Sequence, residues 1–104
     1  MPERVNTVED HPSGTFANRS MVRTVVFQIL YQEEIDEQLT ALARNWTLAR
    51  MSPTDRSILR LATSEILYTD TPKPIAINEA IELAKKFGTK DSPAFVNGIL
   101  DRIQ

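Results

Sequence analysis

The chain contains no cysteine, one histidine and three glycines among its 104 residues. The lack of cysteine excludes disulfide bonds, thiolate metal sites and a cysteine nucleophile. The single histidine, His11, excludes histidine-based triads, the HExxH motif and multi-histidine metal sites, and the few glycines form neither a GxGxxG motif nor a P-loop. We therefore expect a protein that uses no cofactor and no metal.

Long apolar runs are also absent. None approaches the ~18 residues of a membrane span, and the first residues, 1–4, do not resemble a signal peptide. The net charge of -2, from 12 basic and 14 acidic side chains, is not that of a general polyanion binder. Binding to a nucleic acid would then require a local basic patch or a partner. These features favour a cytoplasmic protein with no membrane contact.

The patterns that are present predict one small all-α domain. Residues 1–17 are polar, include Pro2 and Pro12 and show no period, which predicts a flexible N-terminal tail with a solvated His11. Residues 18–104 carry helical periodicity and none of the alternation typical of strands. The expected architecture is a small helical bundle with about five helical segments.

The first predicted helix holds two apolar stripes that point in different directions. One stripe comprises Val22, Val25, Val26 and Ile29, and the other comprises Ile35, Leu39, Leu42, Trp46 and Ala49. At roughly 100° per residue the two stripes lie about 130° apart, and one straight helix cannot bury both against a single partner. We expect a break or kink near Glu33 and Glu34, or the loss of residues that once separated two helices.

Cap and breaker residues mark the next two helices. Ser52 as N-cap and Pro53 at the first helical position predict a helix that ends near Tyr68. A proline-containing breaker over 70–74 then separates it from a strongly periodic helix predicted over 75–87.

The turn before the last helix has its own signals. Gly88 lies just past the end of the preceding helix, where a glycine in the left-handed conformation is the usual terminator. Ser92 and Pro93 repeat the cap signal, and a final helix is predicted from there towards the C-terminus.

The carboxylates do not form a recognisable catalytic set. Most lie on polar helix faces or at caps, where they are solvated. Glu65 is the exception, because it sits one turn from Leu61 and Ala62 on an apolar helix. It is expected to be half-buried, either paired with an arginine or forming part of a partner surface. No nucleophile, base and orienting group can be assembled from these residues, so we expect a protein that is not an enzyme.

Two groups of basic residues are candidates for RNA contact. Arg19 and Arg23 share one face of the first helix, and three lysines surround the Gly88 turn just before Phe95: Lys85, Lys86 and Lys90. Basic side chains beside an aromatic ring can bind phosphates and stack a base of single-stranded RNA. The alternative is structural: lysines in a last turn complement the helix dipole, and Phe95 fits a core position.

Several long motifs resemble the transcription antitermination factor NusB family. The most specific are IAINEAIELAKKFG at 75–88 and FVNGILD at 95–101. Further matching segments are DRSILRLA at 55–62 with Glu65, Asn45-Trp46 with Arg50, Arg19 with Arg23, and QILYQ at 28–32. The resemblance extends from about residue 18 to the end of the chain. It implies a small NusB-like helical bundle without catalysis.

The resemblance also implies partners and contact residues. Family members pair with the ribosomal protein NusE, bind the boxA element of nascent RNA and support rRNA transcription within the RNA polymerase antitermination complex. The matching RNA-facing positions are Arg19, Arg23, Lys90, Asp91 and Phe95. The matching partner-binding positions are Asp55, Arg56, Arg60 and Glu65.

The chain departs from the family pattern at three places. Residues 20–22 stand where basic or small residues are common, and Ser64 replaces an aromatic. Family members also carry another helix, and part of a further one, where Gln32-Glu33-Glu34 here runs directly into Ile35. That point coincides with the change of direction between the two apolar stripes. We expect an omitted segment, with a homodimer formed by self-association or completion by a partner as the alternatives.

Two other functions remain open at this level. The first is a NusB-like accessory domain related to rRNA cytosine methyltransferases, although the ending at 95–101 favours NusB and the chain has no room for a methyl-donor domain. The second is a helical protein-interaction module that does not bind RNA.

Overall fold

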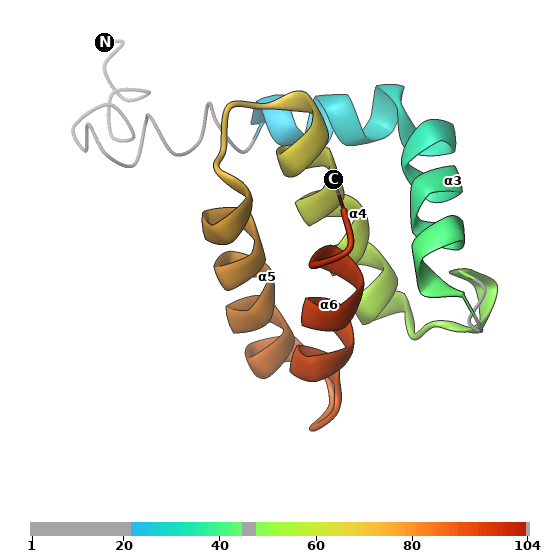
Figure 1. Cartoon of the computed structure of the whole chain (residues 1–104), viewed down its shortest axis with the longest axis vertical. Helices are drawn as coiled ribbons and strands as arrows, with labels where there is room; N and C mark the ends of the chain where they lie inside the picture. Colours follow the sequence, from blue (N-terminus) through green and yellow to red (C-terminus); the bar gives the residue numbers. More distant parts are fainter. Residues whose placement is uncertain (1–21, 45–47, 104) are drawn as a thin grey trace, which may run out of the picture.

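The structure is a computed structural model that describes residues 22–44 and 48–103. Arg19, His11 and Trp46 lie outside the described residues, as does the expected tail over 1–17. Within the described ranges every regular element is a helix and no strand occurs, which confirms the all-α prediction (Figure 1).

Five helical elements follow a helical segment over residues 22–30, called segment 22–30 below. They are α3 (Gln32–Ala43), the short 3-10 helix η1 (Leu48–Arg50), α4 (Pro53–Tyr68), α5 (Lys73–Phe87) and α6 (Ser92–Leu100). α4 packs against α3, α5 and α6, and α5 packs closely along α6. Segment 22–30 crosses the top of this bundle, as Figure 1 shows.

The core lies between α3, α4 and α6. Its fully buried aliphatic side chains are Ile35, Leu39, Leu59, Val96 and Leu100. α5 contributes small residues, Ala80 and Ala84, which let it approach its neighbours closely. α5 and α6 form a helical hairpin whose open end is closed by Lys73. Its Nζ donates to the backbone carbonyls of Asp101 and Ile103, which ties the start of α5 to the residues after α6.

The start of α4 confirms the cap prediction. The Ser52 hydroxyl accepts a hydrogen bond from the backbone N–H of Asp55 at 3.1 Å, and Pro53 occupies the first helical position. α4 ends at Tyr68, as predicted. α5 begins at Lys73, two residues earlier than the predicted start, because Pro74 is accommodated in its first turn, where no N–H donor is needed.

The turn between α5 and α6 differs from the prediction. Gly88 has φ -96° and ψ -165°, so it is extended and not left-handed. A glycine is still required there, because a Cβ atom would collide with the side chain of Ser92. Ser92 is the first residue of α6 and not its N-cap, which is Asp91. The Ser92 hydroxyl instead accepts from the backbone N–H of Thr89 at 2.9 Å, and this hydrogen bond closes the turn.

The predicted kink is present and lies at Tyr31, two residues before Glu33. Tyr31 has φ -115° and ψ 25°, outside the helical values, while helical hydrogen bonds continue on both sides of it. Its ring stacks on that of Tyr68, with centroids 4.6 Å apart. The change of direction lets Ile35 and Leu39 reach the core although the preceding stripe points elsewhere.

The first apolar stripe does not face the core. Val22, Val25, Val26 and Ile29 are between 42% and 65% exposed. Segment 22–30 instead turns Thr24 and Phe27 towards the end of α4, where the Phe27 ring lies 6.3 Å from that of Tyr68. The first stripe and the second stripe therefore do not share one buried face, as their different directions predict.

Ser64 holds segment 22–30 to α4. Its buried hydroxyl donates to the backbone carbonyl of Thr24 at 3.1 Å, across 40 residues of sequence. This serine thus provides both the small volume and the hydroxyl donor that the contact requires.

We predict that Ser64→Ala lowers the free energy of unfolding by about 1 kcal/mol, the net value of one neutral hydrogen bond. Ser57→Ala, at an exposed position of the same helix, controls for the higher helix propensity of alanine. Urea denaturation followed by circular dichroism measures both. Equal stability of the wild type and Ser64→Ala would contradict the anchoring role.

Candidate functional site

An apolar groove runs between α4 and α5, and its charged lining residues are three glutamates and one lysine, Lys86. Its volume is about 610 Å³, and its lining includes Ile58, Leu61 and Glu65 from α4 with Glu79, Glu82 and Leu83 from α5. A second hollow of about 340 Å³ shares Ile58 and Leu83 with it and reaches Phe87. The two hollows form one depression along the α4–α5 seam, which we call the α4–α5 groove. Its shape and charge suit an apolar segment that also carries a cation.

Glu65 is a polar residue of this groove whose surroundings disfavour its charged form. Partial burial raises the pKa of its carboxyl group above the ordinary value, and the neighbouring charge of Glu79 raises it further. In the described part of the chain no arginine forms an ion pair with Glu65. Of the two roles expected for Glu65, the described residues show no arginine pair, and Glu65 lies on the open surface of the groove.

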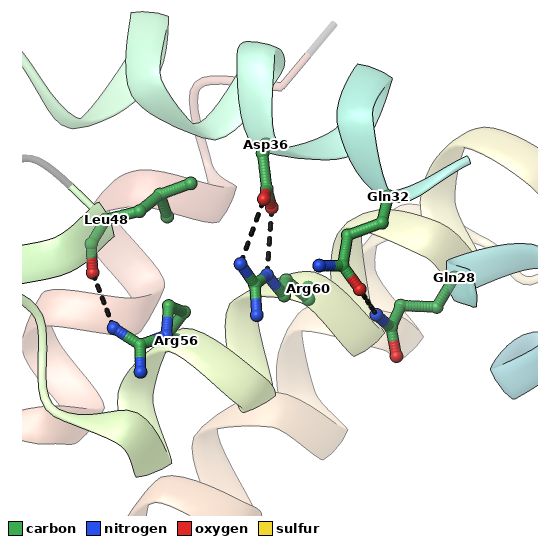
Figure 2. Close-up of polar contacts among 6 residues, drawn as sticks. All are labelled: Gln28, Gln32, Asp36, Leu48, Arg56 and Arg60. Atoms are coloured by element: carbon green, nitrogen blue, oxygen red, sulfur yellow. Dashed lines mark hydrogen bonds and ion pairs between the residues drawn. The ribbon is translucent and has the colours of Figure 1, made fainter. Parts of the chain in front are cut away.

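The two arginines predicted at the partner surface are held by other parts of the bundle (Figure 2). Nε and Nη2 of Arg60 donate to the two carboxylate oxygens of Asp36 on α3, at 2.8 and 2.9 Å. Nη1 of Arg56 donates to the backbone carbonyl of Leu48 in η1 at 2.8 Å. Both guanidinium groups therefore point to the α3 side of α4, away from the groove. Their present contacts are structural.

Asp55 lies in the first turn of α4. Its backbone N–H binds the Ser52 cap, and its Oδ1 is buried with no hydrogen-bond donor among the residues that the structure describes. Of the four predicted partner-binding residues, only Glu65 lines the α4–α5 groove.

Lys90, Asp91 and Phe95 lie together at the turn into α6. Lys90 and Asp91 are exposed, whereas Phe95 is half-buried and packs against the core. Phe95 also lines a hollow of about 410 Å³ together with Arg44 and Arg102. Nη1 of Arg102 donates to the backbone carbonyl of Leu42 at 2.6 Å, which fixes the guanidinium at this hollow.

Sequence reasoning missed these two arginines. Arg44 ends α3 with φ 60°, and Arg102 follows α6, so they meet only through the packing of α3 on α6. No local motif connects residues that far apart.

Arg23 is far from the α5–α6 turn. It lies on segment 22–30, near the end of α4, and its guanidinium carbon is 5.9 Å from the centroid of the Phe27 ring. In Figure 1 the α5–α6 turn is at the opposite end of the bundle. The structure therefore groups Lys90, Asp91 and Phe95, and it places Arg23 apart from them.

Residues 22–44 and 48–103 contain no cluster of three or more side chains suited to a metal ion. In the same residues no helix is both long and apolar enough to cross a membrane.

Comparison with known proteins identifies the family. The family model described as the NusB family matches residues 5–104. The chain belongs to the NusB family. It is 49% identical over 98 residues to the transcription antitermination protein NusB of Geobacter sulfurreducens, which covers 92% of this chain and 71% of that protein. It is 57% identical over 72 residues to the protein of the same name from Geotalea daltonii, which covers 68% of this chain and 50% of that protein.

A solved structure gives the same result for the fold. The NusB of T. maritima superimposes with a TM-score of 0.73 at 44% sequence identity, over 77% of this chain and 57% of that one. This NusB-family chain therefore spans a little over half of that relative. The relatives are named as antitermination proteins and not as enzymes, in agreement with the non-enzymatic function expected from the sequence.

We predict that Asp36 and Arg60 stabilise the fold as a pair. A double-mutant cycle with Asp36→Ala and Arg60→Ala should give a coupling free energy of about 1 kcal/mol, near the upper end for partly exposed pairs because the contact is bidentate. The coupling should decrease as salt is added. Additive effects of the two substitutions on urea denaturation would show that Arg60 is free for another partner.

We predict that the charge of Glu65 destabilises the fold at neutral pH. The folded state holds this proton more tightly than the unfolded chain does, so the contribution favours folding at low pH and is lost as the pH rises above the ordinary glutamate pKa. Glu65→Gln should be more stable than wild type at pH 7 and should lose less stability between pH 4 and 7. Glu37→Gln, at an exposed position of α3, is the control. Identical pH profiles for Glu65→Gln and wild type would contradict the raised pKa.

Proposed function

We propose that this chain acts in the cytoplasm as a transcription antitermination factor that pairs with NusE on boxA RNA and supports rRNA transcription within the RNA polymerase antitermination complex. The observation that carries the proposal is the match of the NusB family model to residues 5–104. The names of the relatives, transcription antitermination protein NusB, supply the process.

For NusE we propose the α4–α5 groove as the docking surface. Its apolar part would bury aliphatic side chains of the partner, and its lining carries Glu65, Glu79 and Glu82 against one lysine, Lys86. Glu82 is already paired with Lys85, so Glu65 and Glu79 are the carboxylates left for a cation. Ribosomal proteins carry basic side chains with which they bind RNA, so a NusE segment has the charge that complements these carboxylates. Glu65 gains most from such a partner, because a nearby cation removes the penalty of its ionised form.

For RNA we propose a contact surface at the α5–α6 turn, with Lys90 on phosphate, Asp91 at the turn and Phe95 beside a base. Arg44 and Arg102 add two guanidinium groups at the hollow that Phe95 lines. Arg23 and Arg19 would contact a more distant part of the same RNA. Because the net charge is -2, the isolated chain should have low affinity, and NusE should supply the remaining phosphate contacts.

The two alternatives differ from this proposal in testable ways. A methyltransferase accessory domain would bind rRNA independently of NusE, and the names of the relatives favour NusB over it. A protein-interaction module would bind NusE and never RNA.

We predict weak, strongly salt-dependent binding of labelled boxA RNA by the chain alone and a clear gain in affinity when NusE is added. Fluorescence anisotropy at several salt concentrations measures both. Lys90→Ala should weaken the binding of the complex several-fold and flatten the salt dependence by about one phosphate contact. Arg50→Ala, at an exposed position of η1, is the matched control.

The NusE surface is tested by adding increasing amounts of NusE to the chain and the labelled RNA in the same anisotropy measurement. Glu65→Gln should weaken NusE binding, and the control Glu37→Gln should leave it unchanged. Tight RNA binding without NusE at physiological salt would contradict the need for a partner. NusE binding without any RNA binding would support the interaction module instead.

A further inference from the structure

Gly98 lies within α6 although the fold does not require a glycine there. Its backbone is helical, and neither of the described glycines has a positive φ. Within the described ranges, no atom lies within 4 Å of the point that a Cβ of Gly98 would occupy, apart from its chain neighbours and the backbone of its own helix. A glycine inside a helix is less stable than an alanine. Gly98 therefore keeps a space open where an alanine would stabilise the fold.

This open space belongs to the hollow of about 410 Å³ that Phe95 lines, which we call the Gly98 hollow. Ala94, Gly98 and Arg102 are spaced by four residues, so they follow one face of α6, and Arg44 at the end of α3 lies across from them. The volume is within the range of about 300–1,000 Å³ that is typical of small-molecule sites. The hollow therefore has the size of a ligand pocket and a floor of small residues.

The charges of the Gly98 hollow select an anion. Among the described residues that line it, only Arg44 and Arg102 are charged. Neither of them forms an ion pair with a carboxylate of residues 22–44 or 48–103. Arg102 is already oriented by its hydrogen bond to the backbone carbonyl of Leu42. Two guanidinium groups with no carboxylate partner suit a phosphate group.

The rest of the lining suits a flat, uncharged group. Ala94, Phe95, Gly98 and Ile99 form an apolar surface, and the missing Cβ of Gly98 lets a planar group approach the helix backbone closely. A nucleotide combines the two parts, a planar base and a phosphate. RNA-binding proteins recognise single-stranded RNA largely through bases that are turned out of the strand.

We propose that the Gly98 hollow holds one nucleotide turned out of the bound RNA, with its base on Ala94 and Gly98 and its phosphate beside Arg44 and Arg102. The inference rests on the RNA binding of the proposed function. It adds to that function a pocket for a single unpaired nucleotide, and it assigns a role in binding to Gly98.

Substitutions of Gly98 separate binding from folding. Gly98→Ala and Gly98→Leu each introduce a better helix former, so both variants should resist urea at least as well as the wild type. Gly98→Leu fills the floor of the hollow and should weaken boxA RNA binding by the complex with NusE about tenfold, the effect of losing one stacked base. Ala41→Leu is the control, because Ala41 is an exposed small residue of α3 that does not line the hollow.

An abasic scan of the RNA tests whether a base occupies the hollow. Each nucleotide of boxA RNA is replaced in turn by an abasic one, and fluorescence anisotropy gives the affinity of the complex with NusE. At one position the loss of the base should weaken binding to the wild type about tenfold and leave binding to Gly98→Leu unchanged, because both changes remove the same contact. At every other position the two proteins should show equal losses.

The phosphate contact is tested at Arg44. Arg44→Gln should weaken RNA binding several-fold and reduce the slope of log affinity against log salt by about 0.7, the value for one phosphate of a single strand. Arg50→Gln is the control, because Arg50 is an exposed arginine of η1 that does not line the hollow.

Three results would overturn the pocket and leave the proposed function in place. In the first, Gly98→Leu binds RNA as the wild type does while Lys90→Ala binds more weakly. In the second, no abasic position has an effect that depends on Gly98. In the third, a free nucleoside monophosphate binds the wild type at micromolar concentration and does not bind Gly98→Leu, which would assign the hollow to a soluble nucleotide. Absence of RNA binding by the wild-type complex would instead contradict the proposed function and this inference together.

Discussion

Every described element of this fold depends on α4, which contacts five neighbours with one helical surface. Its buried residues pack against α3, α5 and α6, Arg60 and Arg56 reach to α3 and η1, and Ser64 binds segment 22–30. The sector that faces α5, which includes Ile58, lines the groove. Polar groups on this helix are therefore divided by direction. Those that point to α3 and η1 already form hydrogen bonds within the fold. The carboxylate of Glu65 lines the groove and is available to bind a cation of a partner.

This division explains why the partner-binding residues were predicted only in part. The motif around Asp55, Arg56 and Arg60 identifies the family, but a motif does not say which way a side chain points. Arg60 is bound by Asp36, 24 positions earlier, and Arg56 by a carbonyl in η1. Such contacts come from the packing of α3 on α4 and cannot be predicted from spacing within one helix. The half-buried state of Glu65, by contrast, followed from its position one turn after Leu61.

Helix boundaries were predicted well where local chemistry sets them and less well where tertiary contacts do. Ser52 and Pro53 mark the start of α4 by themselves, because the cap needs no other part of the molecule. At Gly88 and Ser92 the residues were correctly singled out, but their roles differ because the two side chains share one tight turn. The kink at Tyr31 was detected through the mismatch between two apolar stripes. The exposure of the first stripe could not be predicted in this way. Periodicity shows that one face of a helix is apolar, but it does not show what covers that face.

The contact of Lys73 with the residues after α6 has a consequence for how the molecule opens. It closes α5 and α6 into a hairpin whose two ends are joined across about 30 residues and whose helices pack closely on each other. Regions with many buried contacts open only at a high free energy, whereas regions with few contacts open first. Segment 22–30 contacts α4 instead through the Ser64 hydrogen bond and the rings of Phe27 and Tyr68. Amide protons should therefore exchange with solvent first in segment 22–30, while the hairpin stays closed until the whole domain unfolds.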